Sequence, residues 1–196
     1  MTSKLDLLEQ LEVISRTEWR AWLKKHHART EGIWLVTWKK STPGKYLPYA
    51  AIVEEALCFG WIDSLPRKLD EQRTMLYLCP RKPRSVWSKL NKDRIEKLEA
   101  VGLMTSIGRA KIEAAKRDGS WTKLDIVEAL GVPEDLAKAL AAERTATKHF
   151  NAFPPGSRKI ILQWISSAKT ATTRARRIKD TVELAAKNIR ANHYRQ

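Results

Sequence analysis

The sequence has no long hydrophobic run and contains only two cysteines. No stretch reaches the roughly 18 to 20 apolar residues that a membrane-spanning helix needs. Acidic residues interrupt the N-terminal segment, so no signal peptide is indicated, and we expect a cytoplasmic protein without a transmembrane segment. Cys58 and Cys79 lie in the apolar segments ALCFGW and LYLCPR, which favours buried free thiols over a disulfide.

Standard catalytic and metal-binding motifs are also lacking. The sequence has no GxSxG, no P-loop, no GxGxxG after a strand and no HExxH. It has no CxxC and no Cys/His cluster with the spacing of zinc ligands. His26 and His27 lie at the end of a basic helix, where solvent exposure is the simpler interpretation. We therefore expect no metal and no cofactor.

Positive charge is in large excess. The chain has 37 Lys and Arg against 22 Asp and Glu, a net charge of +15. The excess is densest in residues 158–196, where ten basic residues face two acidic ones. A field of this size attracts phosphates, anionic lipid headgroups or acidic proteins, although it also serves solubility alone.

The first 120 residues predict a mixture of helices and strands. Ser15 and Glu18 have the spacing of a capping box at the start of a helix. The segment IWLVTWKK alternates in the manner of a strand. Two more strands are predicted on either side of a turn at Asp70 and Glu71, and Pro66 should keep the first of them at an edge or a bulge.

From Ser85 onward the pattern is mainly helical. Two apolar stripes recur at three and four residues and predict amphipathic helices that face a core: Ile160, Ile161, Trp164, Ile165 and Ala168 form one, and Ala175, Ile178, Val182, Ala185 and Ile189 form the other. The predicted fold is α+β, with a small antiparallel sheet and packed helices in residues 1–120 and an all-helical part in residues 121–196.

Two segments concentrate polar and aromatic side chains, CFGWIDS at 58–64 and PRKPRSVWSKLN at 80–91. If the strands pair as predicted, they offer a carboxylate, a guanidinium, hydroxyls, an amide and two indoles to one pocket. Asp63 could orient Arg81, which could then bind an anion in bidentate fashion. The candidate ligand-binding residues are Trp61, Asp63, Arg81, Ser85, Trp87, Ser88 and Asn91. In the structural alternative, the tryptophans belong to the core, Asp63 and Arg81 form a salt bridge, and Ser85 caps a helix.

A second candidate site lies near the C-terminus, where Lys169, Arg174 and Arg177 could bind anionic groups. The alternative is a solvated basic face of a helix.

Several of these segments resemble a known family. EALCFGWIDS, PRKPRSVWSKLN, GxxxIEAAKRDGSW and the C-terminal VPEDLAKAL and FNAFPPGSRKIILQWISSAKTATTRARRI are similar to the YdeI/OmpD-associated (bacteriocin-protection, OmdA) family of small bacterial proteins. The similarity extends from about Trp19 to Ile189. It implies a role in resistance to bacteriocins or cationic peptides and association with an outer-membrane porin, in members described as periplasmic. It implies no catalytic residues. The positions that match its motifs are Trp61, Asp63, Ser64, Arg81, Ser85, Trp87, Ser88, Asn91, Trp164, Lys169, Arg174 and Arg177.

Three functions remain open from the sequence. The first is a non-enzymatic stress-resistance or interaction protein that binds an anionic partner. The second is an enzyme that acts on a small anionic metabolite, with Asp63 as acid or base. The third is a sequence-independent nucleic-acid binder, whose affinity would fall steeply with salt.

Overall fold

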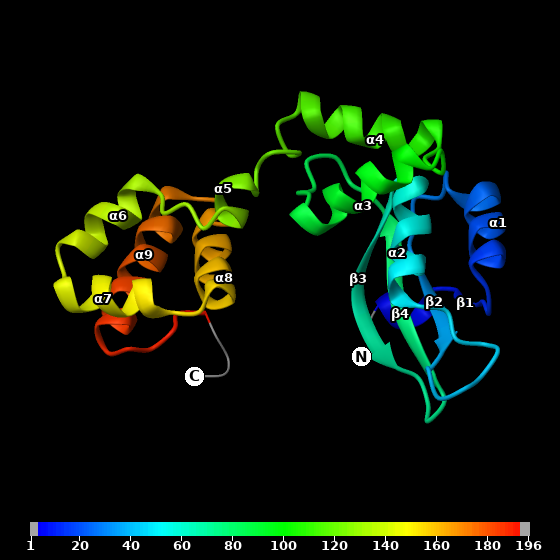
Figure 1. The fold of residues 1–196 in the computed structure, drawn as a ribbon, viewed down its shortest axis with the longest axis horizontal. Coiled ribbons are helices and arrows are strands. Elements are labelled where there is room, and N and C mark those ends of the chain that lie inside the picture. Colours follow the sequence, from blue (N-terminus) through cyan, green and yellow to red (C-terminus); the bar gives the residue numbers. More distant parts are fainter. Residues whose placement is uncertain (1–3, 193–196) are drawn as a thin grey trace. The chain divides into compact units, whose positions relative to one another are not determined.

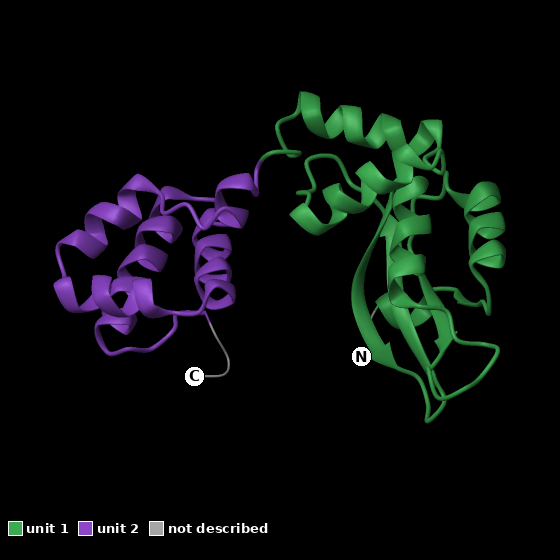
Figure 2. Ribbon diagram, viewed as in Figure 1, with its two compact units in different colours: residues 1–122 green, residues 123–196 purple. Residues whose placement is uncertain are grey.

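The structure is a computed structural model that describes residues 4–192. The chain forms two compact units that divide between Thr122 and Lys123, called unit 1 and unit 2 below (Figure 2). Unit 1 combines helices with a sheet, and unit 2 is helical (Figure 1). The predicted α+β fold class is therefore confirmed.

Unit 1 contains a four-stranded sheet, in the order β1-β2-β4-β3. Its elements are η1 (Lys4–Leu7), β1 (Gln10–Glu12), α1 (Arg16–His26), β2 (Ile33–Trp38), α2 (Tyr49–Cys58), β3 (Trp61–Lys68), β4 (Arg73–Pro80), α3 (Lys89–Ala100) and α4 (Ser106–Arg117). Strand β4 pairs antiparallel with both β2 and β3. The short strand β1, which the sequence did not indicate, pairs parallel with β2.

The hairpin of β3 and β4 follows the sequence prediction. Asp70 accepts backbone hydrogen bonds from Gln72 (2.8 Å) and Arg73 (2.6 Å), which closes the turn. The register of β3 shifts between Asp63 and Pro66, on the edge strand of the sheet. A proline cannot donate to a strand ladder, so it is tolerated at an edge or a bulge.

The two faces of the sheet have different cores. Ile33 and Leu35 of β2 lie in the main core, together with buried residues of α1, α2, α3 and α4. The alternate side chains Trp34 and Val36 belong to a small cluster on the opposite face, against η1. There the Trp34 indole donates a hydrogen bond to the Leu5 carbonyl at 2.7 Å. Alternate side chains of β2 are therefore buried on both faces of the sheet rather than on one face.

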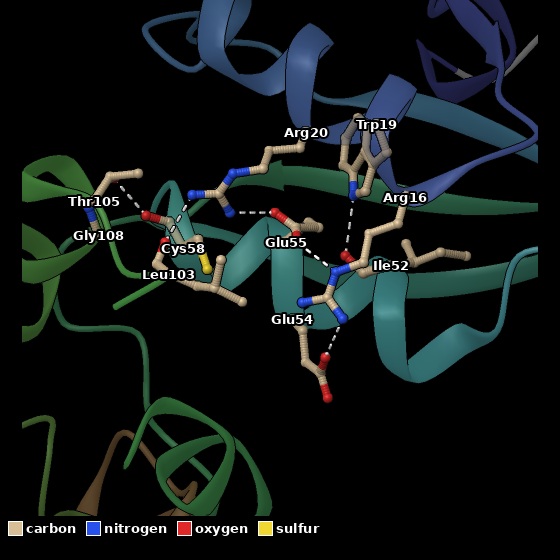
Figure 3. Close-up of polar contacts among 10 residues, drawn as sticks. All are labelled: Arg16, Trp19, Arg20, Ile52, Glu54, Glu55, Cys58, Leu103, Thr105 and Gly108. Atoms are coloured by element: carbon tan, nitrogen blue, oxygen red, sulfur yellow. Dashed lines mark hydrogen bonds and ion pairs between the residues drawn. The ribbon is translucent and has the colours of Figure 1, made fainter. Parts of the chain in front are cut away.

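A buried charge network connects α1 with α2 (Figure 3). Glu55 is 1% exposed and accepts hydrogen bonds from Arg16 Nε (2.5 Å) and Arg20 Nη1 (2.6 Å). Arg16 also pairs with Glu54 (2.9 Å), and Arg20 donates to the Leu103 carbonyl at 2.8 Å. The network therefore fixes the position of the segment between α3 and α4 as well as that of two helices.

Unit 2 packs its helices around a core of its own. The helices are α5 (Asp125–Glu128), α6 (Glu134–Ala141), α7 (Arg144–Ala152), α8 (Pro155–Ser166) and α9 (Ala171–Ala186). Ile161, Ile165, Ile178 and Ala185 of the predicted stripes are buried in this core, whereas Ile160 is 39% exposed. No helix within residues 4–192 is both long enough and apolar enough to cross a membrane.

Candidate functional site

A cleft of ≈780 Å³ opens in unit 1 where β4 ends. Five parts of the chain line it: the segment around η1, the loop between α1 and β2, the turn between α2 and β3, the end of β4, and α4. Its wall carries the rings of His27, Phe59 and Tyr77, and its basic residues include Arg81, Lys82 and Lys111. A cleft of this volume fits a small metabolite.

A smaller pocket of ≈70 Å³ adjoins the cleft. Both hollows share Arg81, Lys82, Pro83 and Lys111. The remaining residues that line the small pocket are Arg84, Ser85, Trp87, Ala114, Ala115, Asp118 and Ser120. Arg81 therefore lies at the junction of a wide hollow and a narrow one.

Arg81 is buried without a carboxylate partner. Its side chain is 4% exposed and stacks on Trp87, with the guanidinium carbon 3.4 Å from the ring centroid. Its two hydrogen bonds both come from Nη1, to Ser85 Oγ (3.4 Å) and the Val86 carbonyl (3.3 Å). Nε has no acceptor within residues 4–192. Burial lowers the pKa of Arg81 to about 10, because the charged form loses hydration.

The backbone around Arg81 is held from both sides. Its N–H donates to the Gly60 carbonyl at 2.9 Å, which ties the end of β4 to the turn after α2. Three residues later Arg84 adopts a left-handed conformation, with φ 61°, and its N–H donates to Asp118 Oδ2 at 3.1 Å. Trp87 then packs against Trp121, with ring centroids 5.2 Å apart. The loop that presents Arg81 is thus fixed to α4 and to the segment after it.

The structure brings together three of the seven predicted residues of this cluster, Arg81, Ser85 and Trp87. Ser88 instead caps α3, since its hydroxyl accepts a hydrogen bond from the Asn91 N–H at 3.3 Å. The buried Asn91 side chain accepts from Arg94 at 2.8 Å. Ser88 and Asn91 therefore serve the start of a helix.

Neither Trp61 nor Asp63 makes a hydrogen bond or ion pair with the Arg81 side chain, although the charge of Asp63 acts on it. Trp61 is buried in the core and donates to the His27 carbonyl at 3.1 Å. Asp63 accepts a hydrogen bond from the Tyr49 hydroxyl at 2.5 Å, beside a different pocket of ≈330 Å³. Because Asp63 pairs with Leu78 in the register of the sheet, it lies further down the strand than the end from which Arg81 emerges. Within residues 4–192 the suggested Asp63–Arg81 ion pair is not formed.

The Tyr49–Asp63 pair shows what Asp63 does in the structure. Burial and the hydrogen bond to Asp63 raise the pKa of Tyr49 to about 12, since the neutral phenol can donate and the phenolate cannot. Ser64, the next motif position, is exposed on the edge strand. Asp63 is thus placed to hold Tyr49.

The basic residues near the C-terminus contact unit 2 itself. Arg174 forms a bidentate pair with Asp135, at 2.6 and 2.9 Å. Arg177 donates to the Trp164 carbonyl and to Ser167 Oγ (2.9 Å), at the C-terminal end of α8. Both guanidiniums therefore stabilise the helices, and Lys169 is exposed beside them.

We expect Arg174→Gln to lower the free energy of unfolding by up to about 1 kcal/mol, since the pair with Asp135 is largely exposed. The hydrogen bond from Arg174 lowers the pKa of Asp135, so the pair stabilises the fold above the ordinary carboxyl pKa. This stabilisation disappears as the pH falls through the lowered pKa, and the variant should match the wild type there. Urea unfolding at pH 7 and pH 2.5 measures both effects. Arg176→Gln, an exposed neighbour on α9, is the control, and an equal loss in both variants would contradict the assignment.

The sequence analysis missed the residues that other segments contribute to the cleft. Lys111 comes from α4, and His27, Phe59 and Tyr77 come from a loop, a turn and a strand. Lys111 falls inside the quoted motif GxxxIEAAKRDGSW, at one of the unspecified positions. The spacing of the residues within each segment gave no signal that these segments meet.

Comparisons with known proteins match the two parts of the chain to different families. Residues 11–111, more than half of the chain, match the family model described as a domain of unknown function (DUF8412). Residues 129–188 match the model described as Bacteriocin-protection, YdeI or OmpD-Associated (OmdA), so this similarity is narrower than the range from Trp19 to Ile189 predicted above. No curated protein and no solved structure matches significantly. The chain therefore belongs to the DUF8412 family and carries an OmdA domain in its C-terminal part.

Proposed function

We propose that this chain is a non-enzymatic binding protein whose DUF8412 part holds a small anionic ligand in the cleft beside Arg81. The observation that carries the proposal is the burial of Arg81 without a carboxylate of residues 4–192 in direct contact; Asp63 acts on it only through its charge. A buried cation normally needs an ion pair, because the free-energy cost of losing its hydration is otherwise uncompensated. A bound anion would supply the missing partner.

The Arg81 guanidinium keeps buried N–H donors that the described part of the chain does not use. Nε and Nη2 make no hydrogen bond within residues 4–192, while Nη1 is used by the loop. Parallel N–H groups on one edge are the geometry through which arginine binds a carboxylate or a phosphate in bidentate fashion. Stacking on Trp87 fixes the plane of the group before a ligand arrives.

The charges around the cleft favour the same class of ligand. Lys82 and Lys111 line both hollows and form no ion pair within residues 4–192. The other cations of the cleft are already paired, Arg29 with Glu9 and Lys4 with Glu31. The site therefore keeps an excess of positive charge for a ligand.

We expect benzoate and phenyl phosphate to bind the full chain at low salt in isothermal titration calorimetry, and benzyl alcohol, which lacks the charge, to bind at least tenfold more weakly. Arg81→Gln should reduce the affinity for both anions at least tenfold, because it removes the charged donors. Arg117→Gln removes the same charge from an exposed position on α4 outside the lining of either hollow, and should bind as the wild type does.

Two outcomes would overturn the proposal. One is that neither anion binds. The other is that Arg81→Gln, with an unchanged circular dichroism spectrum and melting temperature, binds them as the wild type does.

A further inference from the structure

We infer that the ligand is an organic phosphate, whose phosphate group occupies the small pocket and whose apolar or planar body lies in the cleft. This inference rests on the proposed function and names the chemistry of its ligand. It depends on the division of the site into two hollows of very different size that meet at Arg81.

The size of the small pocket limits what can enter it. A volume of ≈70 Å³ exceeds what one water needs, since a water has a share of about 30 Å³ in the liquid. It admits a compact group of a few heavy atoms and excludes an aromatic ring. The larger part of a ligand must therefore remain in the cleft, where the rings of Phe59, Tyr77 and His27 provide an apolar wall.

The charge of the small pocket distinguishes a phosphate from a carboxylate. Of the described residues that line it, four are cations and one is an acid: the cations are Arg81, Lys82, Arg84 and Lys111, and the acid is Asp118. A phosphomonoester carries a charge of about −1.5 to −2 at pH 7, whereas a carboxylate carries one negative charge. A phosphate therefore neutralises more of the excess positive charge of the small pocket than a carboxylate does.

Asp118, the one acid among the described lining residues of the small pocket, already accepts hydrogen bonds from the backbone. Asp118 Oδ2 accepts from the Arg84 N–H at 3.1 Å, and its Oδ1 accepts from the Ser120 N–H at 2.9 Å. The carboxylate thus holds the backbone on both sides of the small pocket. Its negative charge remains, and the surrounding cations outnumber it.

Donors reach the small pocket from several directions. Ser85 contributes a hydroxyl beside Arg81, and the buried Ser120 contributes a second hydroxyl from the turn after α4. Lys111, half-buried on α4, lines both hollows and adds a second cation to them. A tetrahedral anion with three terminal oxygens can use donors arranged around it, whereas a planar carboxylate uses one plane.

Four probes with the same ring separate these properties. Phenyl phosphate is tetrahedral and doubly charged, phenyl sulfate is tetrahedral and singly charged, benzoate is planar and singly charged, and benzyl alcohol is neutral. We expect the affinity of the full chain to fall in that order in calorimetry at constant ionic strength. Phenyl phosphate should bind at least tenfold more tightly than benzoate.

Lys111→Gln tests the small pocket itself. The variant should bind phenyl phosphate about tenfold more weakly than the wild type does. Its affinity for benzoate should fall less than threefold, because benzoate does not depend on the second cation. Lys116→Gln, one turn further along α4 and outside the lining of both hollows, is the matched control. Inorganic phosphate should compete with phenyl phosphate in the wild type.

The outcomes separate this inference from the proposed function. If benzoate binds as tightly as phenyl phosphate and both depend on Arg81, the anion site stands and the phosphate assignment is overturned. The assignment also falls if Lys111→Gln weakens both probes equally. If no anion binds, both proposals fall together.

Discussion

Replacing Arg16 and Arg20 together by methionine is expected to lower the free energy of unfolding by about 3–5 kcal/mol. Both arginines pair with Glu55, which is 1% exposed, while their own side chains are 39% and 33% exposed. Methionine keeps much of the apolar stem but removes the charges. The double variant therefore leaves a buried carboxylate without a cation. Burying an unpaired charge carries a large free-energy cost.

The asymmetry of burial makes the reciprocal substitution milder. In Glu55→Gln the two half-exposed guanidiniums can regain water, and the amide can still accept a hydrogen bond. We expect a loss of about 1–3 kcal/mol, the range for removing one partner of a buried polar contact. Arg109→Met is the matched control, since Arg109 is 50% exposed and its pair with Glu99 should contribute less than about 1 kcal/mol.

Urea unfolding followed by tryptophan fluorescence measures these losses, because Trp19 and Trp22 lie on the same helix as the two arginines. An Arg16/Arg20 double variant that loses no more stability than Arg109→Met would show that Glu55 does not depend on its partners. A ranking with Glu55→Gln as the most damaging change would contradict the argument from burial.

Local signals explain which parts of the fold could be predicted from the sequence. The capping residue Ser15 does accept from the Glu18 N–H at 3.1 Å, and Asp70 does close the predicted turn. In each case the contact joins residues fewer than five apart, so the sequence contains the whole interaction. Strand β1 escaped prediction because a run of three residues, Gln10–Glu12, is too short to show alternation.

Contacts between distant segments account for what the sequence analysis missed. Glu55 lies three residues after Ile52 on the buried face of α2, a position at which a carboxylate signals a buried partner. Its partners Arg16 and Arg20 are 39 and 35 residues away, and no pattern links them to it. Arg81, Ser85 and Trp87 come from one dense segment and lie together, but Lys111 reaches them only through the packing of α4.

The position of α4 itself depends on a glycine. A Cβ added at Gly108 would lie 2.4 Å from the Cys58 carbonyl oxygen and 2.8 Å from the Met104 side chain. That carbonyl oxygen also accepts a hydrogen bond from Thr105 Oγ1 at 2.6 Å (Figure 3). Moving the carbonyl away from a new Cβ would therefore break this hydrogen bond. The N-terminal end of α4 therefore approaches the end of α2 more closely than any other residue would allow.

We expect Gly108→Ala to lower the free energy of unfolding by about 1–3 kcal/mol, although alanine is the better helix former by about 0.5–1 kcal/mol. Displacing this end of α4 also moves Lys111, one turn further on, so the affinity for phenyl phosphate should fall with stability. Gly156→Ala is the control: a Cβ there, in the first turn of α8, meets nothing within 4 Å and should leave both quantities unchanged or raise stability slightly. Calorimetry and urea unfolding on the same variants decide the matter. A stabilised Gly108→Ala that binds phenyl phosphate normally would mean that α4 is not positioned by this contact, and Lys111 would then need another explanation for its place in the lining of the two hollows.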